Sequence, residues 1–226
     1  MSSEQVLIFP TPQCNSKFPS SPSQGPRYLP IPTRSSNKFT LVLDLDETLV
    51  HSSATPILNP DQIVQISSSA GVKTFYVKYR PGMSDFLRKV SSHFDLVLYT
   101  ASTQQYAEQV VNKIDPNRKL LKHRLYRQDC VFNSGFYIKD LGRLGRDLSQ
   151  VIIVDDSITS FAYHLNNGVP IQRWTGDIND NELEKAHGLL FRLLQIQDVR
   201  PVLCSIFNLP KLIEDYKVQT NAIQSN

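Results

Sequence analysis

Short apolar runs alternate with helical patterns through the middle of the chain. The runs at 39–45, 94–99 and 151–154 have strand length and are mostly apolar, which is typical of strands buried on both faces of a parallel sheet. The segments 84–91 and 103–114 instead place apolar residues at helical spacing. This alternation predicts an α/β fold in which helices cover both faces of a doubly wound parallel sheet.

The pattern beyond residue 114 supplies further elements of the same fold. A helix is expected at 158–165, a short strand at 169–171, and a helix at 181–194 with acidic residues in its first turn. The segment 125–138 mixes strand and loop signals. For the earlier helix at 84–91, Ser84 is the candidate N-cap.

A β-rich segment follows the first strand. Residues 62–66 and 72–79 favour strands, and 67–71 connects them as a hairpin loop. We therefore expect a small β insertion at about 54–79, beside the edge of the sheet where the first strand ends.

Composition divides the chain into three parts. Seven of the 14 prolines lie before residue 37, and this Ser- and Pro-rich stretch predicts a disordered tail at 1–36. We expect one domain at 37–210 and a short tail at 211–226. The 1–36 segment resembles neither a secretory signal nor a mitochondrial presequence, and no apolar run is long enough to span a membrane.

The cysteines indicate the cellular compartment, and the net charge limits the kinds of partner. Cys14, Cys130 and Cys204 are widely separated and fit neither a disulfide framework nor a zinc site. We therefore expect a reducing compartment, the nucleus or the cytoplasm. The net charge of +3 is too small to indicate direct binding of nucleic acid.

Positive charge is concentrated in one stretch of ten residues. It comprises Arg118, Lys119, Lys122, His123, Arg124 and Arg127. Two interpretations stay open: attraction of a phosphorylated substrate, or a solvated face without a partner.

Polar residues follow three of the predicted strands. Asp44 and Asp46 close the first, Thr100 closes the second, and Asp155 and Asp156 close a third. The carboxyl ends of parallel strands meet at one edge of the sheet, which is where ligands bind in such folds. Carboxylates gathered there repel one another unless a cation neutralises them, and an oxygen-only set favours Mg²⁺ over zinc.

Four motifs together resemble a known family. DLDETLVHSS (44–53), LYTAS (98–102), SGFYIKDL (134–141) and VIIVDDS (151–157) are similar to the successive motifs of the FCP/SCP phosphatases of the haloacid dehalogenase superfamily. The resemblance runs from about residue 39 to about residue 208. It implies a Rossmann-like α/β fold and a Mg²⁺-dependent protein serine/threonine phosphatase.

The resemblance also implies roles for single residues. Asp44 would be the nucleophile that forms an aspartyl-phosphate, and Asp46 the general acid and base. Thr100 and Lys139 would contact the phosphoryl group. The implied Mg²⁺ ligands are Asp44, Asp156 and the backbone carbonyl of Asp46, with Asp155 supporting the site.

The substrate stays open between alternatives. The family resemblance implies the carboxy-terminal domain (CTD) of RNA polymerase II. In the small CTD phosphatases, however, an arginine lies in the loop that Asn133 and Ser134 occupy here. The Ser134-Gly135 pair and the runs 117–130 and 198–203 are more similar to Dullard-type phosphatases, which implies a lipin-type substrate. A catalytically silent binding protein of the same fold is the remaining alternative.

Overall fold

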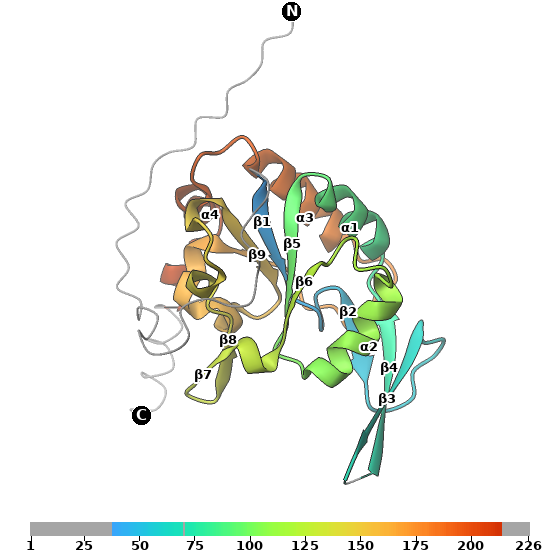
Figure 1. Cartoon of the computed structure of the whole chain (residues 1–226). Helices are drawn as coiled ribbons and strands as arrows, with labels where there is room; N and C mark the ends of the chain where they lie inside the picture. Colours follow the sequence, from blue (N-terminus) through green and yellow to red (C-terminus); the bar gives the residue numbers. More distant parts are fainter. Residues whose placement is uncertain (1–37, 70, 214–226) are drawn as a thin grey trace, which may run out of the picture.

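A five-stranded parallel sheet forms the centre of the molecule. The structure is a computed structural model and describes residues 38–69 and 71–213. Within these residues the strand order is β10-β9-β1-β5-β6 (Figure 1). The strands are β1 (Phe39–Leu43), β5 (Phe94–Tyr99), β6 (His123–Leu125), β9 (Val151–Asp155) and β10 (Gly168–Pro170). The chain runs outward from β1 to β5 and β6 and then returns to the other side of β1, so the order reverses between β1 and β9. The predicted doubly wound sheet is confirmed.

The apolar runs form the central strands because both of their faces are covered. All five residues of β1 are buried. Leu41 and Leu43 join the core on one face of the sheet, whereas Val42, between them, joins the core on the other. This alternation follows the two-residue repeat of a strand, and it explains why the sequence shows a continuous apolar run instead of an alternating one.

Four α-helices contribute to the core that contains Leu41 and Leu43. They are α1 (Met83–Ser91), α2 (Gln104–Ile114), α3 (Glu182–Leu193) and α4 (Val199–Phe207). The predicted N-cap of α1 is wrong: Ser84 lies inside the helix, and Gly82 precedes it with a φ of 75°. Glycine adopts this left-handed conformation without steric cost, so the chain enters α1 through a backbone turn and not through a side-chain cap.

The opposite face is covered by short 3-10 segments. The core on this face, which contains Val42, includes Leu141 and Leu144 of η2 (Leu141–Leu144) and Phe161 and Leu165 of η4 (Ile158–Asn167). The α-helix expected at 158–165 is therefore replaced by 3-10 structure, and non-helical dihedral angles at Phe161 and His164 interrupt it. Two further 3-10 turns are η1 (Arg127–Asp129) and η3 (Leu148–Gln150).

Two small antiparallel sheets project from the end of the central sheet drawn lowest in Figure 1. One has the order β2-β4-β3, formed by β2 (Val50–Ser53), β3 (Gln62–Ser68) and β4 (Gly71–Tyr79). The predicted β insertion is confirmed, but β2 was missed, and the connection between β3 and β4 is shorter than the expected loop at 67–71. The other is the hairpin of β7 (Val131–Asn133) and β8 (Phe136–Ile138). Its connecting residues, Ser134 and Gly135, both have positive φ, which tight hairpin turns require.

A fourth helix was not expected from the pattern. It is α4 (Val199–Phe207), and the Asp198 carboxylate accepts a hydrogen bond from the Arg200 N–H at its start. The sequence pattern does not predict this helix because it contains Pro201, and proline usually interrupts a helix. Proline is tolerated in the first turn, however, where the N–H has no partner within the helix.

Some predictions fall on the ends of the chain. The tail at 1–36 and most of the tail at 211–226 lie outside the described residues, so the domain boundaries stay predictions. Among the described residues, no helix is both long and apolar enough to cross a membrane. Cys130 is a free thiol, whereas Cys204 is disulfide-bonded.

Candidate active site

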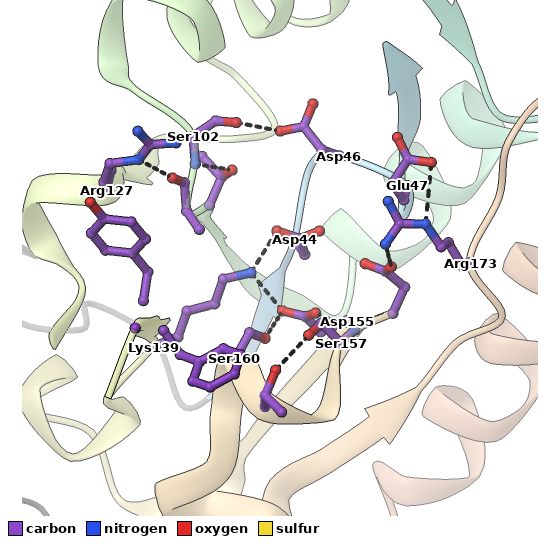
Figure 2. Close-up of a pocket in the computed structure, with 17 residues that line it drawn as sticks. Asp44, Asp46, Glu47, Ser102, Arg127, Lys139, Asp155, Ser157, Ser160 and Arg173 are labelled. Atoms are coloured by element: carbon purple, nitrogen blue, oxygen red, sulfur yellow. Dashed lines mark hydrogen bonds and ion pairs between the residues drawn. The ribbon is translucent and has the colours of Figure 1, made fainter. Parts of the chain in front are cut away.

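The ends of three parallel strands deliver polar side chains to one pocket. Asp44 follows β1, Thr100 follows β5, and Asp155 is the last residue of β9. All three line an open pocket of about 370 Å³ (Figure 2). This pocket lies where the strand order reverses, the usual ligand site of a doubly wound sheet. The predicted convergence of Asp44, Asp46, Thr100, Asp155 and Asp156 is confirmed, since all five line it.

Lys139 bridges two of the aspartates at the bottom of this pocket. Its Nζ donates to Asp44 Oδ1 and to Asp155 Oδ2, both at 2.5 Å, and the lysine is only 1% exposed. Asp155 Oδ2 also accepts from the Ser160 hydroxyl at 2.5 Å, and Oδ1 accepts from the Ser157 N–H at 2.8 Å. Asp155 thus has partners for both oxygens, which suits a residue that holds its neighbours in place.

The electrostatics of this group leave an excess of negative charge. Burial raises the pKa of Asp44 to about 8; the Lys139 ammonium acts against this, and the Asp155 carboxylate adds to it. Burial acts to lower the pKa of Lys139, but Asp155 and Asp44 outweigh it and raise the pKa above its usual value. Lys139 therefore stays charged, and one ammonium between two buried carboxylates leaves them incompletely neutralised.

A third carboxylate completes a group that could bind a metal ion. Asp44, Asp155 and Asp156 each offer an oxygen, and these oxygens all lie within 4.8 Å of one another. Burial raises the pKa of Asp156, and Asp155 raises it further. A divalent cation would lower the pKa values of Asp44 and Asp156, and oxygen donors at this spacing suit a hard cation. The residues present therefore fit a metal ion of the Mg²⁺ type.

The carboxylate of Asp46 is directed away from this acidic group. Its Oδ2 accepts from the Ser102 hydroxyl at 2.7 Å, and its Oδ1 from the Tyr106 hydroxyl at 2.8 Å. Figure 2 shows Asp46 on the opposite side of Asp44 from Asp155. The strand ends at Leu43, and the left-handed φ of 63° at Glu47 turns the chain. Asp46 is therefore positioned for a role that differs from that of Asp44.

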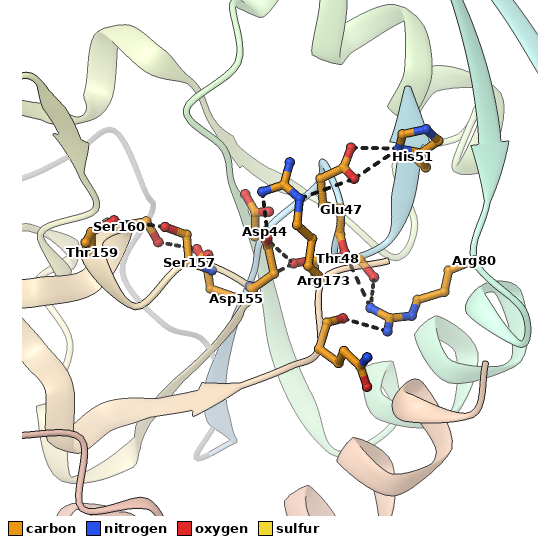
Figure 3. A network of polar contacts seen from close by, with 12 residues as sticks. Asp44, Glu47, Thr48, His51, Arg80, Asp155, Ser157, Thr159, Ser160 and Arg173 are labelled. Atoms are coloured by element: carbon orange, nitrogen blue, oxygen red, sulfur yellow. Dashed lines mark hydrogen bonds and ion pairs between the residues drawn. The ribbon is translucent and has the colours of Figure 1, made fainter. Parts of the chain in front are cut away.

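A buried arginine holds the loop that carries these aspartates. The Arg80 guanidinium donates to the carbonyl of Thr48 at 3.0 Å (Figure 3) and to the carbonyl of Gln172 at 2.8 Å. It also donates to both oxygens of Asp180, each at 2.7 Å. It is 1% exposed. Its guanidinium is thus used to hold the loop in place, and Arg80 does not line the candidate active-site pocket.

Glu47 contacts several of the residues at the rim of the pocket. Its carboxylate contacts His51 Nδ1 at 2.9 Å and the Arg173 guanidinium at 3.8 Å, and Arg173 also reaches Asp156 at 3.3 Å (Figure 3). The backbone N–H of Trp174 donates to the Glu47 carbonyl at 2.9 Å. His51 is thus a hydrogen-bonded neighbour of the site, whereas Arg173, which the sequence pattern did not single out, lines the pocket.

The predicted basic cluster separates into two groups. Arg118 and Arg124 pair with Glu108, and His123 lies 3.6 Å from Asp95. Arg127 differs: its Nε donates to the Ala101 carbonyl at 2.6 Å, its guanidinium lies 5.0 Å from the Tyr137 ring, and it lines the pocket. The sequence signal for Arg127 was the cluster itself, which did not distinguish it from its paired neighbours.

Arg127 also changes the expectation for the substrate phosphate. Asn133 and Ser134 leave the β7–β8 loop without an arginine. Gly135, Phe136 and Tyr137 of this hairpin nevertheless line the pocket together with Arg127. A guanidinium is therefore present on that side after all, and it comes from a different segment.

Comparison with known families agrees with this geometry. Residues 39–200 match the model of the NLI interacting factor-like phosphatases. The chain belongs to this family. Family membership places it in the haloacid dehalogenase superfamily, in agreement with the order of the motifs along the chain.

Curated relatives of this phosphatase family are similar over most of the chain. CTD small phosphatase-like protein 2 of Dictyostelium discoideum is 45% identical over 83% of this chain and 33% of that protein. The human carboxy-terminal domain RNA polymerase II polypeptide A small phosphatase 1 is 40% identical over 80% of this chain and 70% of that protein. The chain thus spans only part of the length of these relatives.

Solved structures of the same phosphatase family share the fold. A fission yeast RNA polymerase II CTD phosphatase, an Fcp1 variant bound to beryllium fluoride, superposes with a TM-score of 0.54 at 26% identity. The match covers 79% of this chain and 56% of that one. The α/β architecture around the aspartates is therefore that of a known CTD phosphatase.

Proposed function

We propose that this chain is a Mg²⁺-dependent protein phosphatase that removes phosphate from serine or threonine through an aspartyl-phosphate on Asp44. The observation that supports this most strongly is the buried arrangement of Asp44, Lys139 and Asp155, with Asp156 beside it. A structural ion pair does not require a third carboxylate, an open pocket, or two arginines at its rim.

In the proposed first step, an oxygen of Asp44 attacks the phosphorus of the substrate. A new bond forms between this oxygen and phosphorus, and the bond between phosphorus and the serine or threonine oxygen breaks. Asp46 donates a proton to the departing oxygen. Its hydrogen bonds from Ser102 and Tyr106 hold its carboxyl group in a fixed orientation at the pocket.

In the second step, Asp46 accepts a proton from a water molecule whose oxygen attacks the phosphorus. The bond between phosphorus and Asp44 breaks, and inorganic phosphate leaves. The covalent route replaces one difficult displacement by two easier ones. It also returns both aspartates to their starting protonation states.

The cations of the site would stabilise the charge of the transferring group. Lys139 holds Asp44 in place and puts an ammonium beside the phosphoryl oxygens, where fixed charge is most effective because the site is buried. Thr100 would donate a hydrogen bond to these oxygens. Arg127 and Arg173 would bind them from the rim, since guanidinium groups match the geometry of phosphate.

The acidic group explains the metal dependence that we propose. Asp44, Asp156 and the backbone carbonyl of Asp46 would hold Mg²⁺, with Asp155 orienting the neighbouring groups. Bound Mg²⁺ would neutralise charge on the phosphoryl oxygens. The rim also carries only a small β sheet and a hairpin among the described residues, so the pocket stays open enough for a phosphoserine on a protein.

Removal of the metal is expected to abolish turnover. Hydrolysis of an aryl phosphate should fall by about 100-fold or more with a chelator, because a metal ion contributes several kcal/mol of charge stabilisation in such sites. Added Mg²⁺ should restore the rate. Steady-state kinetics with and without chelator measure this. Full activity without metal would contradict the mechanism, and no activity in any condition would favour the silent binding protein.

The substrate that we propose is the phosphorylated CTD of RNA polymerase II, on which the human relative's name indicates that it acts. In that case the protein acts in the nucleus. Heptad peptides phosphorylated on serine should then be hydrolysed with a higher kcat/KM than unrelated phosphopeptides of equal length. Equal rates would remove the support for the polymerase substrate. A higher rate on lipin-derived phosphopeptides would favour the Dullard-like alternative.

A further inference from the structure

A second pocket adjoins the candidate active site. It has a volume of about 430 Å³ and lies between the insertion sheet, formed by β2, β3 and β4, and the start of α2. It shares Asp46, Ser102 and Arg127 with the first pocket. A group bound in the second pocket would therefore lie directly beside a phosphate bound at Asp44.

One wall of the second pocket is the inward face of β4. Alternate residues of a strand lie on the same face, and Val77, Phe75 and Lys73 follow one another on this one. Val77 is buried, Phe75 is half-buried with its ring 5.3 Å from that of Tyr106, and Lys73 is exposed. The face thus ends in a lysine where continued apolar patterning would have placed another hydrophobic residue.

The neighbouring strand adds a polar side chain at the same end of the wall. Ile66 of β3 lies opposite Lys73, and Ser68 lies opposite Gly71. Both Ile66 and Ser68 line the second pocket. The wall therefore changes from apolar to polar over two residue pairs.

Hydrogen bonds between α2 and β3 hold the walls of the second pocket together. The Gln105 amide donates to the Ser67 carbonyl at 3.3 Å, and the Gln109 amide to the Gln65 carbonyl at 3.2 Å. The Gln62 amide donates in return to the Gln109 carbonyl at 2.8 Å. The shape of the second pocket is thus set by the fold and does not depend on a bound ligand.

The second pocket has positive charge without acidic partners. Neither Lys73 nor Arg127 forms an ion pair with an acidic side chain among the described residues. Asp46 is the acidic residue in its lining, and both of its oxygens already accept hydrogen bonds from Ser102 and Tyr106. Lys73 is exposed, so its ammonium can reach an anionic group that enters the second pocket and pair with it at the rim.

We propose that the second pocket binds an anionic side chain of the substrate, a glutamate or a second phosphoserine, one to three residues from the phosphoserine that is hydrolysed. This inference rests on the proposed function, because it takes the first pocket as the place of the phosphate. An extended peptide advances about 3.3 Å per residue, so a residue close in sequence reaches the adjoining pocket. Lys73 is then a specificity-determining residue, and its aliphatic stem, Ile66 and Phe75 contact the methylene groups of the ligand.

The test compares peptides that differ in one charge. A phosphoserine peptide is prepared with glutamate, glutamine or phosphoserine at each flanking position, and kcat/KM is measured for the wild type, for Lys73→Met and for Lys113→Met. Lys113 is exposed in the last turn of α2 and does not line either pocket, so Lys113→Met is the matched control for loss of a positive charge.

At one flanking position, glutamate should exceed glutamine by about two- to five-fold in the wild type, as for a solvent-accessible ion pair, and phosphoserine should exceed it further. This ratio should fall to about one in Lys73→Met, remain in Lys113→Met, and decrease with ionic strength. A wild type without any acidic preference, or an equal preference in Lys73→Met, would overturn the inference.

A binding measurement separates this inference from the proposed function. The same peptides, labelled with a fluorophore, are titrated with Asp44→Asn protein with and without Lys73→Met, and anisotropy is recorded. If the wild type hydrolyses no phosphate but Lys73→Met removes a preference for glutamate in binding, the proposed function fails and the second pocket keeps its role. Equal affinity for glutamate and glutamine peptides would overturn the inference even in an active enzyme.

Discussion

Asp44→Asn is expected to lower kcat for phosphate hydrolysis by about 10⁴-fold or more, because it removes the nucleophile and keeps the size of the side chain. The amide oxygen of asparagine can still accept the hydrogen bond that Lys139 now donates to Asp44 at 2.5 Å. The variant should therefore stay folded. Steady-state kinetics on an aryl phosphate and on a phosphopeptide measure the loss, and circular dichroism checks the fold.

Two further measurements distinguish a nucleophile from a residue that only supports the site. Acid-quenched wild-type enzyme should contain phosphate bound covalently to Asp44, and the Asp44→Asn variant should contain none. Asp85→Asn, an exposed change on α1, is the matched control and should keep the wild-type rate. Activity of Asp44→Asn within ten-fold of the wild type would contradict covalent catalysis by this residue.

Lys139→Met is expected to have the largest effect on stability. Lys139 is 1% exposed and pairs with Asp44 and Asp155. Removal of the ammonium leaves two buried carboxylates without a counter-charge. The loss of one partner lowers the free energy of unfolding by about 3–5 kcal/mol in other buried ion pairs. Turnover should be lost as well. Urea denaturation measures the free energy of unfolding.

The pH dependence and a double variant test the cause of this loss. Burial already raises the pKa of Asp44 to about 8, and Lys139 opposes that shift. In Lys139→Met the pKa of Asp44 should rise further. A carboxyl whose pKa is raised in the folded state destabilises the fold as the pH rises from its unfolded pKa to its folded pKa. Because the folded pKa of Asp44 is already about 8 in the wild type, the two proteins differ in this contribution only as the pH passes 8, so the loss should be larger at pH 9 than at pH 6.

Asp155→Asn added to Lys139→Met should restore part of the stability, because the two residues are in direct contact and their effects are not additive. Lys113→Met, which removes an exposed lysine, should change the free energy of unfolding by less than about 0.5 kcal/mol. A loss below about 1 kcal/mol in Lys139→Met, or no recovery in the double variant, would contradict the role of Lys139 as a buried counter-charge.

The family motifs and the strand ends predicted the composition of the site well, since these features are local. An apolar run followed by an aspartate indicates both a buried strand and the residue at its carboxyl end, and this held for Asp44 and Asp155. Where the predictions failed, the cause was also local. Ser84 has the chemistry of an N-cap, but Gly82 provides the turn into α1, and Pro201 concealed the start of α4.

The sequence by itself determined the order of the elements, the parallel sheet and the set of aspartates, because hydrophobic periodicity and residues adjacent in the chain define them. Only the tertiary structure decided which cations have partners. Arg118 and Arg124 pair with Glu108, whereas Arg127 and Lys73 face pockets. The two-residue repeat predicts which face of β4 Lys73 occupies, but not what lies opposite. That depends on how distant segments pack, and this packing gives Lys139 two carboxylates and leaves Lys73 without one.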